Sequence, residues 1–213
     1  MNILFDLDGT LTDSREGILA CIRHALDALG APLAADVDLD RFLGPPLWGT
    51  FRELLPAGSG EVKVDAAVAA YRERFTRVGM FENRVYDGIP EALATLAGNG
   101  TRLFVATSKP RVFAERILAH FGLADRFERI FGSELDGRLT DKGELIAHVL
   151  STSGLDAAET AMVGDRRHDL EGALQNRVFA VGALWGYGSR DELTASGADL
   201  LLERPGELAT VVV

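Results

Sequence analysis

The chain has 213 residues, of which 47% are hydrophobic, so it has enough apolar material for a buried core and is not a disordered chain. Acidic residues outnumber basic ones by 32 to 22, and the net charge of −10 disfavours binding to nucleic acids or anionic membranes. The single cysteine, Cys21, excludes an intramolecular disulfide, and no apolar run approaches the roughly 20 residues of a membrane-spanning helix. Acids interrupt the opening apolar triplet at once, which excludes a signal peptide. We therefore expect a soluble, cytoplasmic, globular protein.

Short apolar runs alternate with helical segments along most of the chain. The runs are apolar throughout rather than alternating with polar residues, which is typical of parallel strands covered on both faces. The runs lie at 3–5, 103–106, 129–131, 161–163 and 178–181, and helices are expected near 88–98, 110–121, 141–152 and 169–176. This order predicts a doubly wound, Rossmann-like parallel α/β sheet.

The segment 14–79 differs from the rest because it carries helical patterns and no convincing strand. Apolar residues recur at helical spacing over 18–29 and 62–78, and Asp13 and Glu16 form a capping-box-like start to the first pattern. The segment is too long to be a simple crossover between two strands. We therefore predict an inserted α-helical cap domain. The predicted domains are a cap at 14–79 and an α/β core at 1–13 and 80–213.

Polar side chains follow three of the predicted strands at the point where each strand ends. They are Asp6, Asp8, Thr107, Ser108, Asp165 and, four residues further on, Asp169. Ligands of open parallel sheets bind outside the carboxyl ends of the strands, so these groups are expected to converge. A cluster of carboxylates without histidine suits a hard cation, for which Mg²⁺ is the default.

Lysine is rare in this chain, and its positions are therefore informative. Arginine supplies the other basic charges, and the lysines are Lys63, Lys109 and Lys142. Lys109 follows the second polar strand end, and Lys142 lies at an expected helix start. A lysine ammonium is a compact charge that binds phosphate or holds a carboxylate ionised.

Taken together, these motifs resemble the haloacid dehalogenase-superfamily phosphatases with a helical cap, over essentially the whole chain. They stand in the family's order as Asp6-Leu7-Asp8-Gly9-Thr10, Ala106-Thr107-Ser108-Lys109-Pro110, Lys142 and Val163-Gly164-Asp165-Arg166-Arg167-His168-Asp169. Two further segments, Gly44-Pro45-Pro46-Leu47 and Leu184-Trp185-Gly186-Tyr187-Gly188-Ser189, resemble the phosphoglycolate phosphatase and 5′-nucleotidase-like branch.

The resemblance implies a Mg²⁺-dependent phosphomonoesterase with an aspartyl-phosphate intermediate. Asp6 would be the nucleophile, and Asp8 the general acid that later activates water. Asp6, the backbone carbonyl of Asp8 and Asp165 would hold Mg²⁺, with Asp169 supporting them through water.

Phosphate binding is implied for a further group of residues. Thr107 and Lys142 would bind the transferring phosphoryl group and offset the charge on Asp6. The other expected phosphate-binding residues are Gly9, Thr10, Ser108 and Lys109.

Several functions remain open at this point. A phosphoglycolate-like small metabolite is the leading substrate, with a 5′-nucleotidase or a sugar phosphomutase of the same fold as alternatives. A dehalogenase is disfavoured because Asp8 is present, and halide release needs no acid there. A phospho-accepting signalling domain of about 120 residues has no place for the helical insert. The substrate and the oligomeric state stay open. Trp48, near the Pro-Pro turn, either packs within the cap or contacts the leaving group.

Overall fold

The computed structural model describes residues 1–33 and 37–211. The chain divides into two compact units, which are Met1–Asp13 with Val85–Val213, and Ser14–Arg84. Residues 34–36 and 212–213 belong to the predicted domain ranges but lie outside the described residues. Among the described residues, none of the helices combines the length and the apolar character needed to cross a bilayer.

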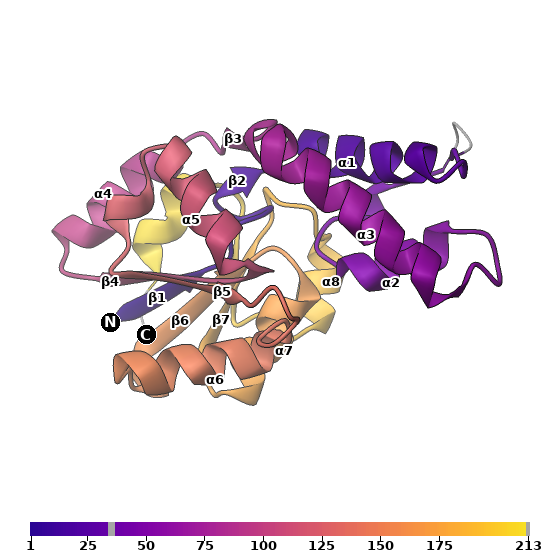
Figure 1. Ribbon diagram of the computed structural model, residues 1–213. Coiled ribbons are helices and arrows are strands. Elements are labelled where there is room, and N and C mark those ends of the chain that lie inside the picture. Colours follow the sequence, from indigo (N-terminus) through magenta and orange to yellow (C-terminus); the bar gives the residue numbers. More distant parts are fainter. Residues whose placement is uncertain (34–36, 212–213) are drawn as a thin grey trace. The chain divides into compact units, whose positions relative to one another are not determined.

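The first unit is built on a six-stranded parallel sheet with the order β5-β4-β1-β6-β7-β8 (Figure 1). The strands are β1 (Asn2–Phe5), β4 (Arg102–Pro110), β5 (Arg129–Ser133), β6 (Thr160–Gly164), β7 (Phe179–Ala183) and β8 (Leu200–Leu202). The chain moves outward from β1 on both sides, because Phe5 pairs with Val105 of β4 and with Val163 of β6. The carboxyl end of β1 is therefore a topological switch point, where such sheets bind ligands.

Helices cover both faces of this sheet, which confirms the predicted α/β class. They are α4 (Ile89–Gly98) and α5 (Arg111–His120) on one face, and α6 (Lys142–Ser153) and α7 (Arg167–Gln175) on the other (Figure 1). Short elements complete the unit: α8 (Arg190–Ala195), η3 (Ala124–Arg126), η4 (Ala157–Glu159) and η5 (Pro205–Thr210). Leu4, Phe104 and Met162 of adjacent strands are fully buried in one cluster with Ile146 and Val149 of α6. This packing is what the continuous apolar runs predict.

The second unit is helical. It contains α1 (Arg15–Ala28), η1 (Asp40–Phe42), α2 (Leu47–Leu54), α3 (Gly60–Arg77) and η2 (Gly79–Phe81). The unit extends to Arg84, beyond the expected end at 79, because residues 79–82 pack on its own helices. Gly17 of α1 donates its N–H to the carbonyl of Glu82, and the guanidinium of Arg74 binds both oxygens of the Glu82 carboxylate at 2.6 and 2.9 Å.

The chain segments at the unit boundaries form two short strands, β2 (Thr12–Asp13) and β3 (Arg84–Val85), which pair in a separate sheet. The expected capping pair at the start of α1 is wrong in its detail. The residue at the N-cap is Ser14, and it makes no side-chain capping bond. The Asp13 carboxylate accepts a hydrogen bond from the Tyr187 hydroxyl at 3.1 Å.

Candidate active site

Lys142 lies at the centre of the polar residues at the carboxyl end of β1. It is the first residue of α6, whose N-cap Asp141 accepts the N–H of Glu144. Its buried ammonium contacts three oxygens: Asp6 Oδ1 at 2.9 Å, Asp169 Oδ1 at 2.7 Å and the carbonyl of Ala106 at 2.9 Å. Burial alone lowers the pKa of Lys142, but the charges of Asp169 and Asp6 more than offset this effect and the pKa is raised. The lysine therefore stays charged between the two carboxylates.

The acidic cluster around this lysine consists of Asp6, Asp165 and Asp169. One carboxylate oxygen of each lies within 4.8 Å of the others, and all three residues are buried. Burial raises the pKa of Asp165 well above its ordinary value, and the charges of Asp169 and Asp6 add to this. Burial likewise raises the pKa of Asp169 to about 6, although Lys142 acts in the opposite direction. One ammonium thus does not compensate three carboxylates.

This donor set fits a divalent hard cation. The converging groups are all carboxylate oxygens, which is the ligand chemistry that Mg²⁺ prefers over the nitrogen and sulfur donors of zinc sites. A cation bound there would supply the positive charge that the raised carboxyl pKa values show to be missing. The residues that the sequence assigned to Mg²⁺ through their side chains, Asp6, Asp165 and Asp169, are therefore together.

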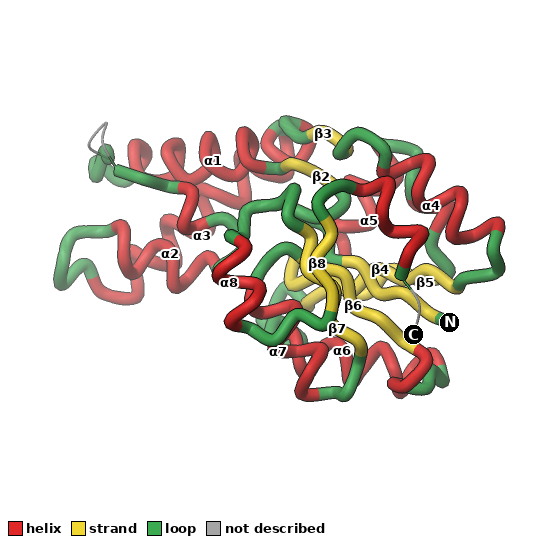
Figure 2. The backbone as a smooth tube through the Cα atoms, turned by 180° about the vertical axis from the view of Figure 1, so that it is seen from behind, coloured by secondary structure: helices red, strands yellow, loops and turns green. Residues whose placement is uncertain are grey.

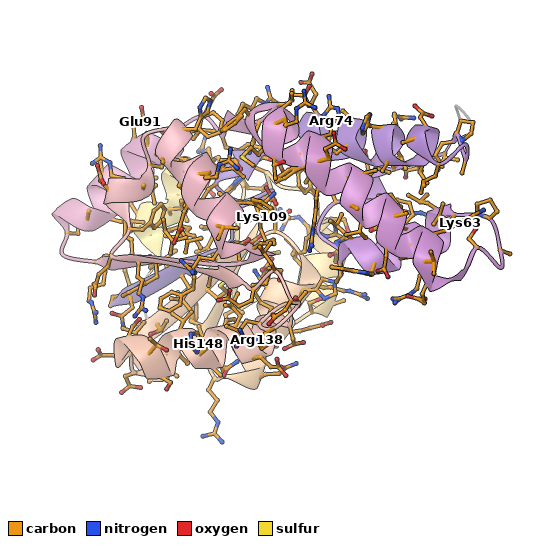
Figure 3. The ribbon with its side chains drawn as sticks, viewed as in Figure 1. Lys63, Arg74, Glu91, Lys109, Arg138 and His148 are labelled. Atoms are coloured by element: carbon orange, nitrogen blue, oxygen red, sulfur yellow. The ribbon has the colours of Figure 1, made fainter. Side chains whose placement is uncertain are left out.

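Asp8 and Lys109 form a second charged pair beside this cluster. The ammonium of Lys109, at the end of β4 (labelled in Figure 3), lies 2.6 Å from Asp8 Oδ2. The other carboxylate oxygen, Asp8 Oδ1, is buried and has no hydrogen-bond partner among the described residues. A buried oxygen without a partner is rare and commonly marks a group that a ligand or a proton engages. Lys109, expected to bind phosphate, is thus also a partner of Asp8.

The remaining residues of the second motif lie where β4 ends. Thr107 is buried, and its hydroxyl accepts the N–H of Lys109 at 3.3 Å. The Ser108 hydroxyl donates to the carbonyl of Thr140 at 3.0 Å, two residues before Lys142. Ser108 therefore ties β4 to the segment that carries the lysine, and its binding of phosphate remains a prediction.

Gly9 and Thr10 shape the turn after β1. Their N–H groups, expected to face phosphate, donate within the turn, to the carbonyls of Thr12 and Leu7. Gly9 has φ +83°, and a Cβ there would collide with the carboxyl group of Asp165. The Thr10 hydroxyl donates to Asp165 Oδ1 at 3.0 Å. Thr10 thus holds a carboxylate of the acidic cluster, a role that the sequence did not indicate.

Residues near the fourth motif mostly have structural partners. Asp169 Oδ2 accepts the N–H of Arg166 at the start of α7, and Arg166 itself forms an ion pair with Glu192 at 2.9 Å. His168 is half-buried, and burial, together with the charge of Arg167, lowers the pKa of its imidazole. It is not in the acidic cluster.

Comparisons with known proteins identify the family of the chain. The model of the haloacid dehalogenase-like hydrolase family matches residues 3–183. A 5′-nucleotidase from Pseudomonas aeruginosa is 52% identical over 91% of this chain and 87% of its own length. A phosphoglycolate phosphatase from Pectobacterium atrosepticum is 31% identical over 99% of this chain and 91% of its own length.

A solved structure shows the same fold. The predicted phosphatase from Clostridium acetobutylicum superposes with a TM-score of 0.91 at 41% identity, and the match covers 98% of this chain and 96% of that one. Because the family model matches well over half of the chain and the relatives are matched over most of their length, the similarity is not confined to isolated motifs. The chain belongs to the haloacid dehalogenase-like hydrolases, and it is a phosphatase.

Proposed function

We propose that the protein hydrolyses phosphomonoesters with Mg²⁺ through an aspartyl-phosphate on Asp6. The observation that carries this proposal is the position of Lys142. Its ammonium contacts both Asp6 and Asp169, and Asp8 lies at the same sheet edge with one carboxylate oxygen that has no hydrogen-bond partner in the described part of the chain. The turn after β1 thus offers Asp6 as a nucleophile and Asp8 as a proton donor. The start of α6 offers Lys142 as the cation beside them.

The first step transfers the phosphoryl group to the enzyme. A carboxylate oxygen of Asp6 forms a bond to phosphorus as the ester P–O bond breaks, and protonated Asp8 gives its proton to the leaving alkoxide. The Thr107 hydroxyl donates to a phosphoryl oxygen, and the charge of the Lys142 ammonium offsets the negative charge at Asp6. Asp6, Asp165 and Asp169 would hold Mg²⁺, and its positive charge would offset the repulsion between the Asp6 carboxylate and the phosphate dianion.

The second step returns the enzyme to its starting state. Water attacks phosphorus, the bond to Asp6 breaks, and Asp8 takes the proton of the attacking water. Lys109 holds Asp8 Oδ2, which leaves Oδ1 for both proton transfers. Inorganic phosphate leaves, and Asp6 is again a carboxylate.

For the substrate, we infer a nucleoside 5′-monophosphate as the first candidate class and a phosphoglycolate-like compound as the second. The sequence alone favoured the compact substrate. The relative named 5′-nucleotidase has 52% identity, against 31% for the relative named phosphoglycolate phosphatase, and this difference favours the nucleotide.

A phosphate-release assay over nucleoside monophosphates, phosphoglycolate and hexose phosphates tests the proposal. EDTA is expected to abolish release and Mg²⁺ to restore it. Asp6→Asn is expected to remove turnover, whereas Asp8→Asn with p-nitrophenyl phosphate is expected to accumulate acid-stable phosphoenzyme, because its second step lacks a base. Substrate conversion without free phosphate would indicate a mutase, and full turnover by Asp6→Asn would refute the mechanism.

A further inference from the structure

The loop 184–189 between β7 and α8 contains a sequence motif to which the proposed mechanism assigns no role. The loop lies beside β8 (Figure 2). Its sequence, Leu-Trp-Gly-Tyr-Gly-Ser, contains one of the two tryptophans of the chain. In this loop two large aromatic residues, Trp185 and Tyr187, are each followed by a glycine. The contacts of the loop indicate what these residues do.

The loop encloses the carboxylate of Asp165. The backbone N–H of Tyr187 donates to Asp165 Oδ2 at 2.8 Å, and the Thr10 hydroxyl donates to Asp165 Oδ1 at 3.0 Å. Each oxygen therefore accepts one hydrogen bond and keeps further lone pairs for another partner. The pair of bonds fixes the plane of the carboxylate.

The two glycines of the loop lie against the same residue. A Cβ on Gly186 would collide with the side chain of Asp165 and the carbonyl of Gly9, and a Cβ on Gly188 would collide with the carbonyl of Asp165. Their φ angles are not in the left-handed region, so close approach rather than backbone conformation requires glycine here.

Trp185 reaches the first motif from this loop. Its half-buried indole N–H donates to the carbonyl of Thr10 at 2.9 Å. Trp185 therefore fixes the backbone of Thr10, and the Thr10 hydroxyl in turn donates to Asp165. Two hydrogen bonds thus connect the indole, through Thr10, to a carboxylate of the acidic cluster. Trp185 is 175 positions from Thr10 in the sequence, and Asp165 is 155 positions from it.

We propose that Trp185 is a positioning residue for the metal site and acts through Thr10 on the orientation of Asp165. The inference rests on the proposed role of Asp165 in binding Mg²⁺. A ligand whose orientation is fixed in advance binds its cation more tightly, since less ordering accompanies binding.

The test is Mg²⁺ affinity, measured without turnover from the Mg²⁺-dependent rise in melting temperature of the EDTA-treated protein. Trp185→Phe keeps an aromatic ring and removes the indole N–H, and we expect it to weaken Mg²⁺ affinity about fivefold or more. Trp48→Phe is the matched control. Trp48 is also half-buried and donates its indole N–H to one acceptor, Asp65 Oδ1 at 3.0 Å, but in the helical unit. Its Mg²⁺ affinity is expected to stay within about twofold of the wild type.

A double-mutant cycle distinguishes positioning from a general loosening of the fold. Thr10→Val removes the hydroxyl that binds Asp165 and keeps the shape of the side chain. If Trp185 acts through Thr10, Trp185→Phe causes little further loss of affinity in the Thr10→Val background. Additive losses, or an unchanged affinity of Trp185→Phe in the wild-type background, would overturn the inference. A wild-type protein without any Mg²⁺ response would instead overturn the proposed metal site.

Discussion

Replacing Lys142 by methionine removes the ammonium from the acidic cluster and keeps a side chain of similar length. The variant leaves Asp6, Asp165 and Asp169 buried within 4.8 Å of one another without their cation. Removing one partner of a buried ion pair costs about 3–5 kcal/mol, which for a chain of this size lowers the melting temperature by about 6–20 °C. We expect a loss in this range at pH 8 in EDTA.

The loss is expected to shrink as the pH falls. Lys142 holds down the pKa of Asp169, which is already raised to about 6, so the variant's Asp169 binds a proton at still higher pH. A carboxyl whose folded pKa lies above its unfolded value destabilises the fold increasingly as pH rises through that window. At pH 5 the carboxyl is protonated in the folded variant, and most of the penalty disappears.

Thermal melts of the EDTA-treated wild type and variant at pH 5, 6.5 and 8 check this expectation. Lys63→Met is the matched control, because Lys63 is an exposed lysine on α3 (Figure 3) and its loss is expected to shift the melting temperature by no more than about 2 °C at any pH. A Lys142→Met protein as stable as the wild type at pH 8, or a loss that does not depend on pH, would refute the reasoning.

Three further outcomes are expected. Mg²⁺ affinity, measured from shifts in melting temperature, should weaken about tenfold or more when the pH falls from 7 to 5. The reason is that protons compete with the cation at Asp169 and Asp165, whose pKa values are raised. An affinity that does not change over this pH range would contradict the assigned ligands. Asp8→Asn should lower the rate of phosphoenzyme formation from alkyl phosphates at least about a hundredfold more than from p-nitrophenyl phosphate, because the nitrophenolate leaves without a proton. Equal losses with both substrates would show that Asp8 is not the general acid. Mn²⁺ should replace Mg²⁺ in the phosphate-release assay and Ca²⁺ should not, since its looser coordination can engage both Asp6 oxygens; equal rates with Ca²⁺ would argue against this geometry.

The inner strands of the sheet were predictable because each contains a run of apolar residues covered on both faces, and the edge strand β5 was predictable from the shorter apolar pair Ile130 and Phe131. The predicted runs overlap β1, β4, β5, β6 and β7. β8 was missed because Leu200–Leu202 is a three-residue edge strand with two half-buried residues, too short for a periodic signal. The helical unit ends at Arg84 in the structure rather than at 79, and tertiary contacts such as the ion pair of Arg74 with Glu82 leave no pattern in the sequence.

The site was predictable to the extent that its residues stand at strand ends in chain order. Asp6, Thr107 and Asp165 are of this kind, since a parallel sheet brings the carboxyl ends of its strands to one edge, whereas Lys142 and Asp169 lie in the first turns of helices. The partners of Lys109 and Thr10 were not predictable. Spacing shows that a lysine lies near an acid, but not that it binds Asp8 Oδ2, and a hydroxyl 155 residues away from Asp165 leaves no local pattern.

The last prediction concerns Trp48, whose aromatic ring either packs within the helical unit or contacts the leaving group of the substrate. Its indole N–H donates to Asp65 Oδ1 at 3.0 Å, and the guanidinium of Arg72 lies 4.9 Å from the ring centroid, so α3 already uses the polar edge and one face of the ring. We therefore expect Trp48→Ala to destabilise the helical unit by about 1–2 kcal/mol and to change kcat/KM for nucleotides and phosphoglycolate in equal proportion. A ring that stacks on a nucleobase contributes about 1–3 kcal/mol, which corresponds to about fivefold to a hundredfold or more in kcat/KM. A selective tenfold loss for nucleotides with an unchanged melting temperature would contradict the packing role and make Trp48 a substrate contact.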